Sequence, residues 1–196
     1  MNVSENRAAH GAFGGGFADP AIESAFAFRT AMNVMAKPGE IRALETARPP
    51  APLSLAAGTL LLTLCDPETG VHLAGACDTA EMRGWLAFHT GAPVVGADRA
   101  EFAVGRWADL APLERYRIGT PDYPDRSATL IVEVDTLETA GATLRGPGIK
   151  DSAALSLPDP AAMAGNAMLY PLGLDFFLTC GGRVAALPRS TQISEG

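Results

Sequence analysis

The first clear hydrophobic pattern follows Asp19-Pro20, where large apolar residues recur three or four positions apart as far as Met35. This spacing is typical of one side of a helix. Asp19 suits the N-cap, Pro20 suits the first helical position, and Pro38-Gly39 marks the end. The pattern therefore predicts a helix with a broad apolar stripe formed by Ile22, Phe26, Phe28, Met32 and Met35, with Arg29 among them.

Two further helices are predicted by their apolar content and their end signals. Residues 53–66, "LSLAAGTLLLTLCD", are apolar nearly all round, which indicates a buried helix. Residues 80–91 follow Asp78 and Thr79, either of which suits the N-cap, and Gly91 suits the end. Two shorter helices are predicted in "WADLAPLER" and "DPAAMAGNAM", at residues 107–115 and 159–168.

Strands are predicted between these helices. The clearest is "SATLIVEV" at residues 127–134, which is rich in β-branched and apolar residues. Residues 174–180 and 183–188 read as a β-hairpin across Gly181-Gly182. Shorter candidates are "EIRALE", "VHLAG", "PVV", "FAV", "ATLRG" and "SAALSL". Because helices alternate with strands, the expected class is α/β with a mixed sheet flanked by helices.

The chain of 196 residues suits a single α/β domain over residues 18–196, preceded by a flexible, Gly-rich arm at residues 1–17. Hydrophobic residues make up 47% of it, which is enough for a substantial core. The net charge of −7 argues against nucleic acid as a partner, since nucleic-acid binders usually carry a basic face. No apolar run is long enough to cross a membrane and no secretory signal opens the chain, so we expect a cytoplasmic protein without a membrane partner.

Cations are the candidates for ligand binding. Thirteen arginines accompany two lysines, and arginine is the side chain suited to bidentate recognition of carboxylate and phosphate. The stretch "RGPGIK" at residues 145–150 is either a cradle for a phosphate-like anion or an ordinary tight turn. "LPRST" places another arginine beside two hydroxyls after a predicted strand. The anion-binding candidates are Arg126, Arg145, Lys150 and Arg189.

Other kinds of site have little support in the sequence. His10, His72 and His89 lack metal-ligand spacing, so no metal site is expected. The glycines at residues 14–16 lack the strand before and the lysine after that a phosphate loop needs, and no cofactor is expected. The cysteines are odd in number and fit reduced thiols. Ser127 and Ser190 keep open a weaker alternative, an independent serine-dependent hydrolase.

Six segments in order and register resemble a known family. They are "FRTAMNVMAKPGEI", "LLLTLCDPETGVHL", "LAFHTGAPVV", "GTPDYPDRSATLIVEV", "LRGPGI" and "YPLGLDFFLTCGGRVAALPRST". Together they closely resemble the PhnH family, a subunit of the bacterial carbon–phosphorus lyase core complex. The resemblance covers residues 18–192.

The resemblance implies a part in phosphonate catabolism, in support of the formation of ribose 1-alkylphosphonate 5-triphosphate from ATP and an alkylphosphonate. It implies a structural or co-catalytic subunit whose partners are the other core subunits, and a homodimer when isolated. It also implies a fold like the large domain of pyridoxal-phosphate-dependent transferases, without the cofactor. The alternative is a subunit with its own site for a phosphonate or nucleotide ligand, for which the four cations above are the candidates.

Overall fold

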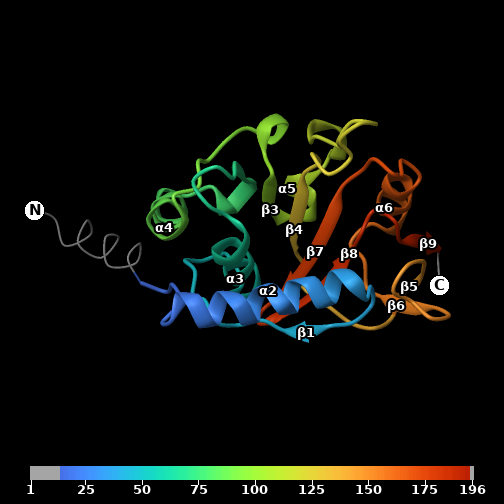
Figure 1. Ribbon diagram of the computed structural model, residues 1–196, viewed down its shortest axis with the longest axis horizontal. Helices are drawn as coiled ribbons and strands as arrows, with labels where there is room; N and C mark the ends of the chain where they lie inside the picture. The colour runs from blue at the N-terminus through green and yellow to red at the C-terminus, as the bar shows by residue number, and fades with distance from the viewer. Residues whose placement is uncertain (1–13, 195–196) are drawn as a thin grey trace, which may run out of the picture.

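The computed structural model describes residues 14–194, and its centre is a six-stranded mixed sheet (Figure 1). The strand order is β1-β8-β7-β4-β3-β2, and the four neighbours β7, β4, β3 and β2 run parallel. The strands are β1 (Arg42–Ala43), β2 (Val71–Leu73), β3 (Phe102–Arg106), β4 (Thr129–Glu133), β7 (Asp175–Cys180) and β8 (Arg183–Leu187). The predicted α/β class and the β7–β8 hairpin are confirmed.

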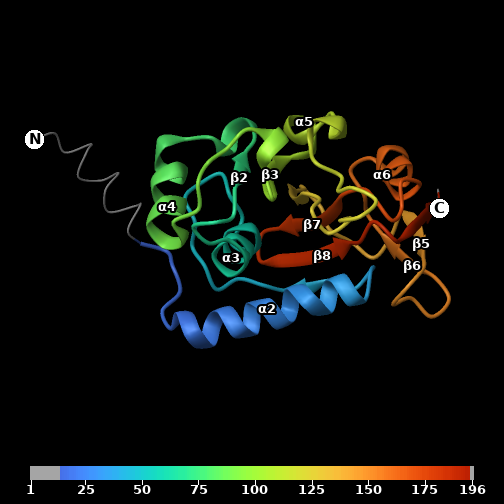
Figure 2. The same cartoon turned by 45° about the horizontal axis from the view of Figure 1, so that its top comes forward.

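A smaller antiparallel sheet lies at one end of the molecule, with strand order β6-β5-β9 (Figure 2). It consists of β5 (Ala142–Arg145), β6 (Ala153–Leu155) and β9 (Gln192–Ser194). The hairpin of β5 and β6 contains the "RGPGIK" stretch, and β9 pairs with the other side of β5. The segment after β8 therefore joins the two sheets.

The central sheet separates two apolar cores because neighbouring side chains of a strand point to opposite faces. Along β4, Ile131 belongs to one core, and Leu130 and Val132 belong to the other. The first core is covered by α2 (Pro20–Ala36), α3 (Leu55–Leu64) and α4 (Ala80–Thr90). The second is covered by α5 (Trp107–Leu110), α6 (Pro160–Ala167) and the small sheet. Single 3₁₀ turns occupy Gly75–Cys77, Ala97–Arg99 and Leu113–Arg115.

The helix ends follow the chemistry that the sequence predicted. The Asp19 carboxylate accepts a hydrogen bond from the backbone N–H of Ile22 at 3.3 Å, and Pro20 opens α2. Thr79 is the cap of α4, through a bond from the Met82 N–H at 3.1 Å. Gly91 ends this helix in the left-handed region, with φ of 71°. Helices at α2, α3, α4 and α6 are thus confirmed.

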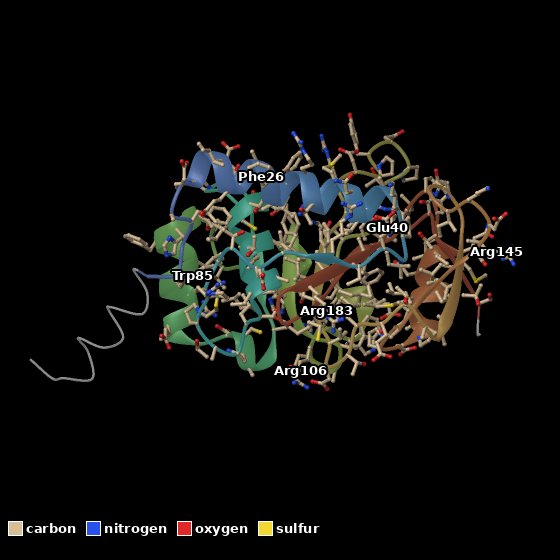
Figure 3. All side chains as sticks on the ribbon, turned by 90° about the horizontal axis from the view of Figure 1, so that it is seen from below. Phe26, Glu40, Trp85, Arg106, Arg145 and Arg183 are labelled. Carbon is tan, nitrogen blue, oxygen red and sulfur yellow. The ribbon has the colours of Figure 1, made fainter. Side chains whose placement is uncertain are left out.

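Helix α2 carries its large apolar side chains on the outside. Ile22, Phe26 and Met32 are 56%, 66% and 55% exposed, whereas the side chains it buries are Ala27, Ala31 and Val34. The small inner residues let the helix lie close against α3 and β8 (Figures 2 and 3). The predicted apolar stripe is therefore real, but most of it faces away from the core.

Two short strands are smaller than the sequence predicted. In "EIRALE", only Arg42 and Ala43 pair, because β1 is an edge strand that meets only the first two residues of β8. In "PVV", Val94 forms an isolated bridge with Val71 and no strand. Among residues 14–194, no helix combines the length and the apolar content that crossing a membrane requires.

Most of the predicted N-terminal arm lies outside the described residues, which begin at Gly14. The carbonyl oxygen of Gly14 accepts hydrogen bonds from Trp85 Nε1 at 3.0 Å and from His89 Nε2 at 3.1 Å. Phe17 packs against the first core. Residues 14–17 therefore join the N-terminal side of α2 to α4, and the division at residue 18 stays a prediction.

Candidate functional site

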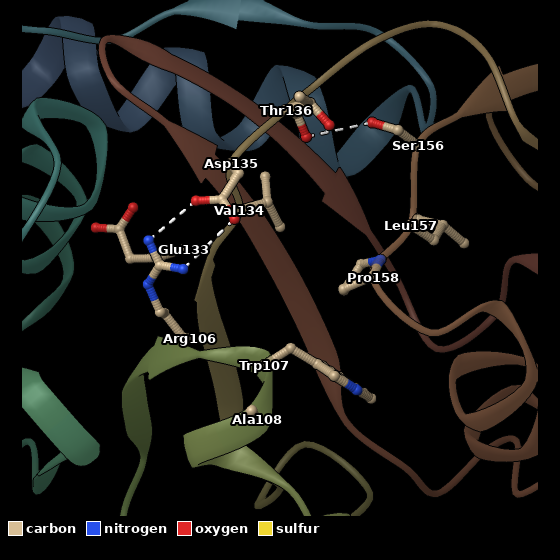
Figure 4. Close-up of a pocket in the computed structure, with 10 residues that line it drawn as sticks. All are labelled: Arg106, Trp107, Ala108, Glu133, Val134, Asp135, Thr136, Ser156, Leu157 and Pro158. Carbon is tan, nitrogen blue, oxygen red and sulfur yellow. Dashed lines mark hydrogen bonds and ion pairs between the residues drawn. The ribbon is translucent and has the colours of Figure 1, made fainter.

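A cavity of about 380 Å³ opens at the carboxyl ends of β3 and β4 (Figure 4). In open α/β sheets this edge is where ligands bind, because loops leave it and side chains converge there. The lining comes from three segments, which follow β3, β4 and β6. They contribute Arg106, Trp107 and Ala108; Glu133, Val134, Asp135 and Thr136; and Ser156, Leu157 and Pro158.

Arg106 and Asp135 form an ion pair at this cavity (Figure 4). Arg106 Nη2 lies 2.9 Å from Asp135 Oδ1, and Nη1 lies 3.4 Å from Oδ2. The two side chains are 66% and 78% exposed, so water screens the pair and it adds little to stability. With Glu133, the cavity holds one cation and two carboxylates, and this balance disfavours an anionic ligand.

Glu133 links the site to the start of α3. Its Oε1 accepts a hydrogen bond from the backbone N–H of Ser54 at 2.7 Å, and its Oε2 accepts one from the Thr179 hydroxyl at 3.2 Å. Burial raises the pKa of the Glu133 carboxyl above its ordinary value, and the bonds from Ser54 and Thr179 and the charge of Arg106 partly oppose this. The carboxylate thus holds α3 against the ends of β4 and β7.

Cys77, which is buried near this edge, is not activated as a nucleophile. Burial raises the pKa of its thiol to about 11, and the charges of Glu133 and Asp109 add to the effect. Burial likewise raises the pKa of Cys65 to about 12. Both remain protonated thiols at neutral pH, and all three cysteines are free, as the sequence predicted.

The four cations predicted from the sequence lie away from this cavity. Arg189 is the most enclosed of them: Nε lies 3.1 Å from Asp175 Oδ1, and Nη1 donates to the Pro124 carbonyl at 2.7 Å. Its Nη2 also donates to the Ser127 hydroxyl. Arg126 stacks on Tyr123, with its Cζ 4.0 Å from the ring centroid. These contacts bring Arg189 next to the segment that contains Arg126 and give Arg189 a structural role.

Arg145 and Lys150 lie on the small sheet instead. Arg145 donates to the Asp151 carbonyl at 3.5 Å, and both side chains are exposed. Arg145 pairs with Gln192 in the β5–β9 ladder, three residues from Arg189. None of the four cations lines this cavity, and none lines the larger cavity between residues 111–118 and α6. Their role in anion binding remains a prediction.

The glycines of "RGPGIK" are explained by close packing. Gly146 and Gly148 have φ of 133° and 83°, which side chains rarely adopt. A Cβ on Gly148 would lie 2.0 Å from the Ala36 carbonyl oxygen at the end of α2, and one on Gly146 would lie 3.1 Å from the Ser190 carbonyl oxygen. The turn therefore fits tightly between the end of α2 and the segment before β9.

His72 and Ser127 have partners that do not suit catalysis. His72 Nδ1 lies 3.1 Å from the Val95 carbonyl, and its Nε2 lies 3.0 Å from Arg115 Nη2. Ser127 accepts from a guanidinium, which cannot remove its proton. Among the described residues, no group of three His, Cys, Asp or Glu side chains could hold a metal ion.

The sequence reasoning missed Arg106, Glu133 and Asp135. A signal for them existed, because Arg106 ends "FAVGR" and Glu133 ends "TLIVE", two strands that become parallel neighbours. Polar residues at the carboxyl ends of parallel strands are the usual place to look. The register Arg106↔Glu133 brings them to the same edge.

Comparison with known proteins gives consistent results. The family described as "Bacterial phosphonate metabolism protein (PhnH)" matches residues 15–194. The chain is 42% identical over 190 residues to the alpha-D-ribose 1-methylphosphonate 5-triphosphate synthase subunit PhnH of Rhizobium meliloti (strain 1021), which covers 92% of this chain and 95% of that protein. It is 29% identical over 178 residues to the putative C-P lyase subunit protein HtxG of Stutzerimonas stutzeri, covering 86% and 84%.

Proposed function

The chain belongs to the PhnH family, and on that premise we propose that it serves phosphonate catabolism by assembly, as a structural or co-catalytic subunit of a carbon–phosphorus lyase complex. In such a complex it supports the formation of a ribose 1-alkylphosphonate 5-triphosphate from ATP and an alkylphosphonate. One relative is named as a subunit of alpha-D-ribose 1-methylphosphonate 5-triphosphate synthase, and the other as a putative C-P lyase subunit protein. The other subunits of the complex are its partners.

The observation that carries assembly is the outer face of α2, defined by Ile22, Phe26, Phe28 and Met32. Each of these side chains is at least half exposed, on a helix whose opposite side is already buried. A helix that is apolar on both sides is typical of one that is covered on both sides. Large apolar side chains exposed together on one element mark protein interfaces. We therefore assign the outer face of α2 to contact with another subunit.

Reconstitution with the other purified core subunits tests this assignment. The wild-type chain should co-elute with them in size-exclusion chromatography, and Phe26→Glu should elute apart, because a carboxylate in an apolar interface loses its hydration. Met168→Glu is the matched control: Met168 is 87% exposed and directly follows α6, a helix that lies apart from α2 (Figure 1). If Phe26→Glu co-elutes with the other subunits and Met168→Glu does not, the interface lies at α6 and not at α2.

Two finer properties follow as proposals. The isolated chain forms a homodimer through the outer face of α2.

The fold is that of the large domain of pyridoxal-phosphate-dependent transferases, without the cofactor, and the run of parallel strands followed by antiparallel β8 is compatible with it. Lys37 pairs with Glu40 at 3.5 Å and Lys150 is exposed on its turn, so neither lysine lines the cavity at the sheet edge. The purified chain should therefore show no visible absorption band that borohydride removes.

The alternative function, a phosphonate or nucleotide site on this subunit, has its remaining support at the exposed pair Arg145 and Lys150. Both cations flank one turn and are exposed to solvent. Calorimetric titration with methylphosphonate and with ATP tests it. Heat that disappears in Arg145→Ala, but not in the exposed control Arg183→Ala, would favour the alternative.

A further inference from the structure

A second cavity, of about 690 Å³, lies between the segment 111–118 and α6. It shares Trp107 with the cavity at the sheet edge, so the two cavities are neighbours. Its volume lies in the range of pockets that hold small molecules, which is roughly 300–1,000 Å³. The lining is mainly apolar and includes the rings of Trp107 and Tyr116, with Leu113, Ile118, Leu169 and Leu174.

The charge of this cavity restricts what it can hold. The charged residues in its lining are Glu114 and Asp159, and none of the described residues that line it is Lys or Arg. An anion such as a phosphonate or triphosphate would meet two carboxylates and no cation, which is unfavourable. The cavity therefore differs in ligand class from any phosphonate site, and it suits a neutral molecule.

The polar side chains buried in the lining are turned into the fold. The Asn166 side chain donates to the Leu174 carbonyl at 2.9 Å and accepts from the Leu174 N–H at 2.8 Å. Tyr116 is 4% exposed, and its hydroxyl oxygen is buried beneath the surface of the cavity. The Arg115 guanidinium lies over the Tyr116 ring, with Cζ 5.3 Å from the centroid. The surface that the cavity offers to a ligand is therefore mainly apolar and aromatic.

We propose that this cavity binds a neutral, planar aromatic or heteroaromatic small molecule through its apolar and aromatic lining. Trp107 and Tyr116 supply aromatic walls, which stack well on flat rings. The aliphatic lining excludes water, and the two carboxylates repel anions. The site is distinct from the outer face of α2, so it can be tested whether or not the chain assembles as proposed.

Gly165 offers a way to close the cavity without disturbing the fold. It lines the cavity on α6, and no atom lies within 4 Å of the position that a Cβ would take. Gly165→Trp should therefore fill the space and also favour the helix, since glycine is a poor helix former. Ala161→Trp is the matched control, because Ala161 is exposed on the same helix and does not line the cavity.

Titration with isoquinoline, a neutral ring with one acceptor nitrogen, followed by NMR at pH 7.5 tests the proposal. Isoquinoline should bind saturably to the wild type and to Ala161→Trp, and at least tenfold more weakly to Gly165→Trp. The wild type should bind naphthalene-2-sulfonate at least tenfold more weakly than isoquinoline. If Gly165→Trp does not fold, Ala162→Leu replaces it. Unsaturable binding, unchanged affinity in the filled variant, or equal affinity for the sulfonate would overturn the proposal.

Discussion

Among single residues, Arg189 shows how an arginine suited to anion binding is already engaged inside the fold. Its guanidinium meets the Asp175 carboxylate, the Pro124 carbonyl and the Ser127 hydroxyl, and its backbone N–H donates to Asp175 Oδ1 at 2.8 Å. The side chains of Arg189 and Asp175 are 13% and 23% exposed, respectively. The contacts tie the end of β8 to the start of β7 and to the segment before β4.

Arg189→Met should therefore destabilise the protein strongly. It leaves the Asp175 carboxylate mostly buried without its cation, which costs about 3 kcal/mol of unfolding free energy. Arg183, the exposed first residue of β8, is the control: Arg183→Met should change the free energy of unfolding by less than about 0.5 kcal/mol. Urea unfolding measures both. Equal effects would show that the ion pair is not what matters.

Glu133 predicts a dependence of stability on pH. Burial raises its pKa in the folded state above the ordinary value of 4.5, so the folded state binds more protons than the unfolded state once the pH passes that value. The contribution of this group is thus fully present below pH 4.5 and is lost as the pH rises through the raised pKa. Glu133→Gln, which cannot titrate, should gain stability relative to the wild type over that range. Urea unfolding from pH 4 to pH 8 tests this, and a constant difference would contradict it.

Sequence reasoning at this scale found residues with suitable chemistry but not their partners. Arg126 and Arg189 were named as anion-binding candidates, and that role stays a prediction. Their contacts with Tyr123 and Asp175 depend on side-chain packing that the sequence does not show. Arg106 and Glu133 were missed, although strand ends in a parallel sheet are a general signal. Distances between side chains on different elements depend on register, which a single sequence does not specify.

At the scale of elements, the turn between β5 and β6 and the helix α6 contain glycines with opposite roles. Gly148 has φ of 83° and faces the Ala36 carbonyl oxygen, whereas Gly165 lies inside a helix with open space around it. Gly148→Ala should destabilise the protein by about 2 kcal/mol or more, from backbone strain and the clash. Gly165→Ala should stabilise it by about 0.5–1 kcal/mol. Thermal unfolding of the two variants measures the contrast, and equal shifts would contradict it.

Element positions were well predicted where end signals and spacing agreed. Asp19-Pro20, Thr79 and Gly91 gave helix limits close to those observed, because caps are local chemistry. The outward orientation of the α2 stripe was not predicted. Spacing shows that a helix has an apolar side, but not whether that side meets this chain's own core or another molecule. The length of the edge strand β1 was overestimated for a similar reason, since pairing at the edge of a sheet depends on how far the neighbouring strand extends.

For the whole molecule, the α/β class followed from the alternation of helices and strands, and the two cores follow from alternation along β4. The small sheet could not be foreseen, because β9 reaches β5 only through tertiary packing. Resemblance across six segments indicated the family, which a match over residues 15–194 confirms. A family carries information about partners that the composition of one chain does not.

The outer face of α2 leads to a prediction about the oligomeric state. An exposed apolar helix face that is the same on two copies can bury itself by two-fold pairing. Multi-angle light scattering should give the mass of two chains for the isolated wild type and for Met168→Glu, and the mass of one chain for Phe26→Glu. The outer face of α2 cannot contact a second copy and a partner subunit at the same time. Adding a partner subunit that binds this face should therefore convert the homodimer into a complex in which each copy of this chain binds one partner subunit. A wild-type monomer, or a Phe26→Glu dimer, would exclude pairing through α2, while a homodimer that persists with the partner bound would place the partner on a different surface.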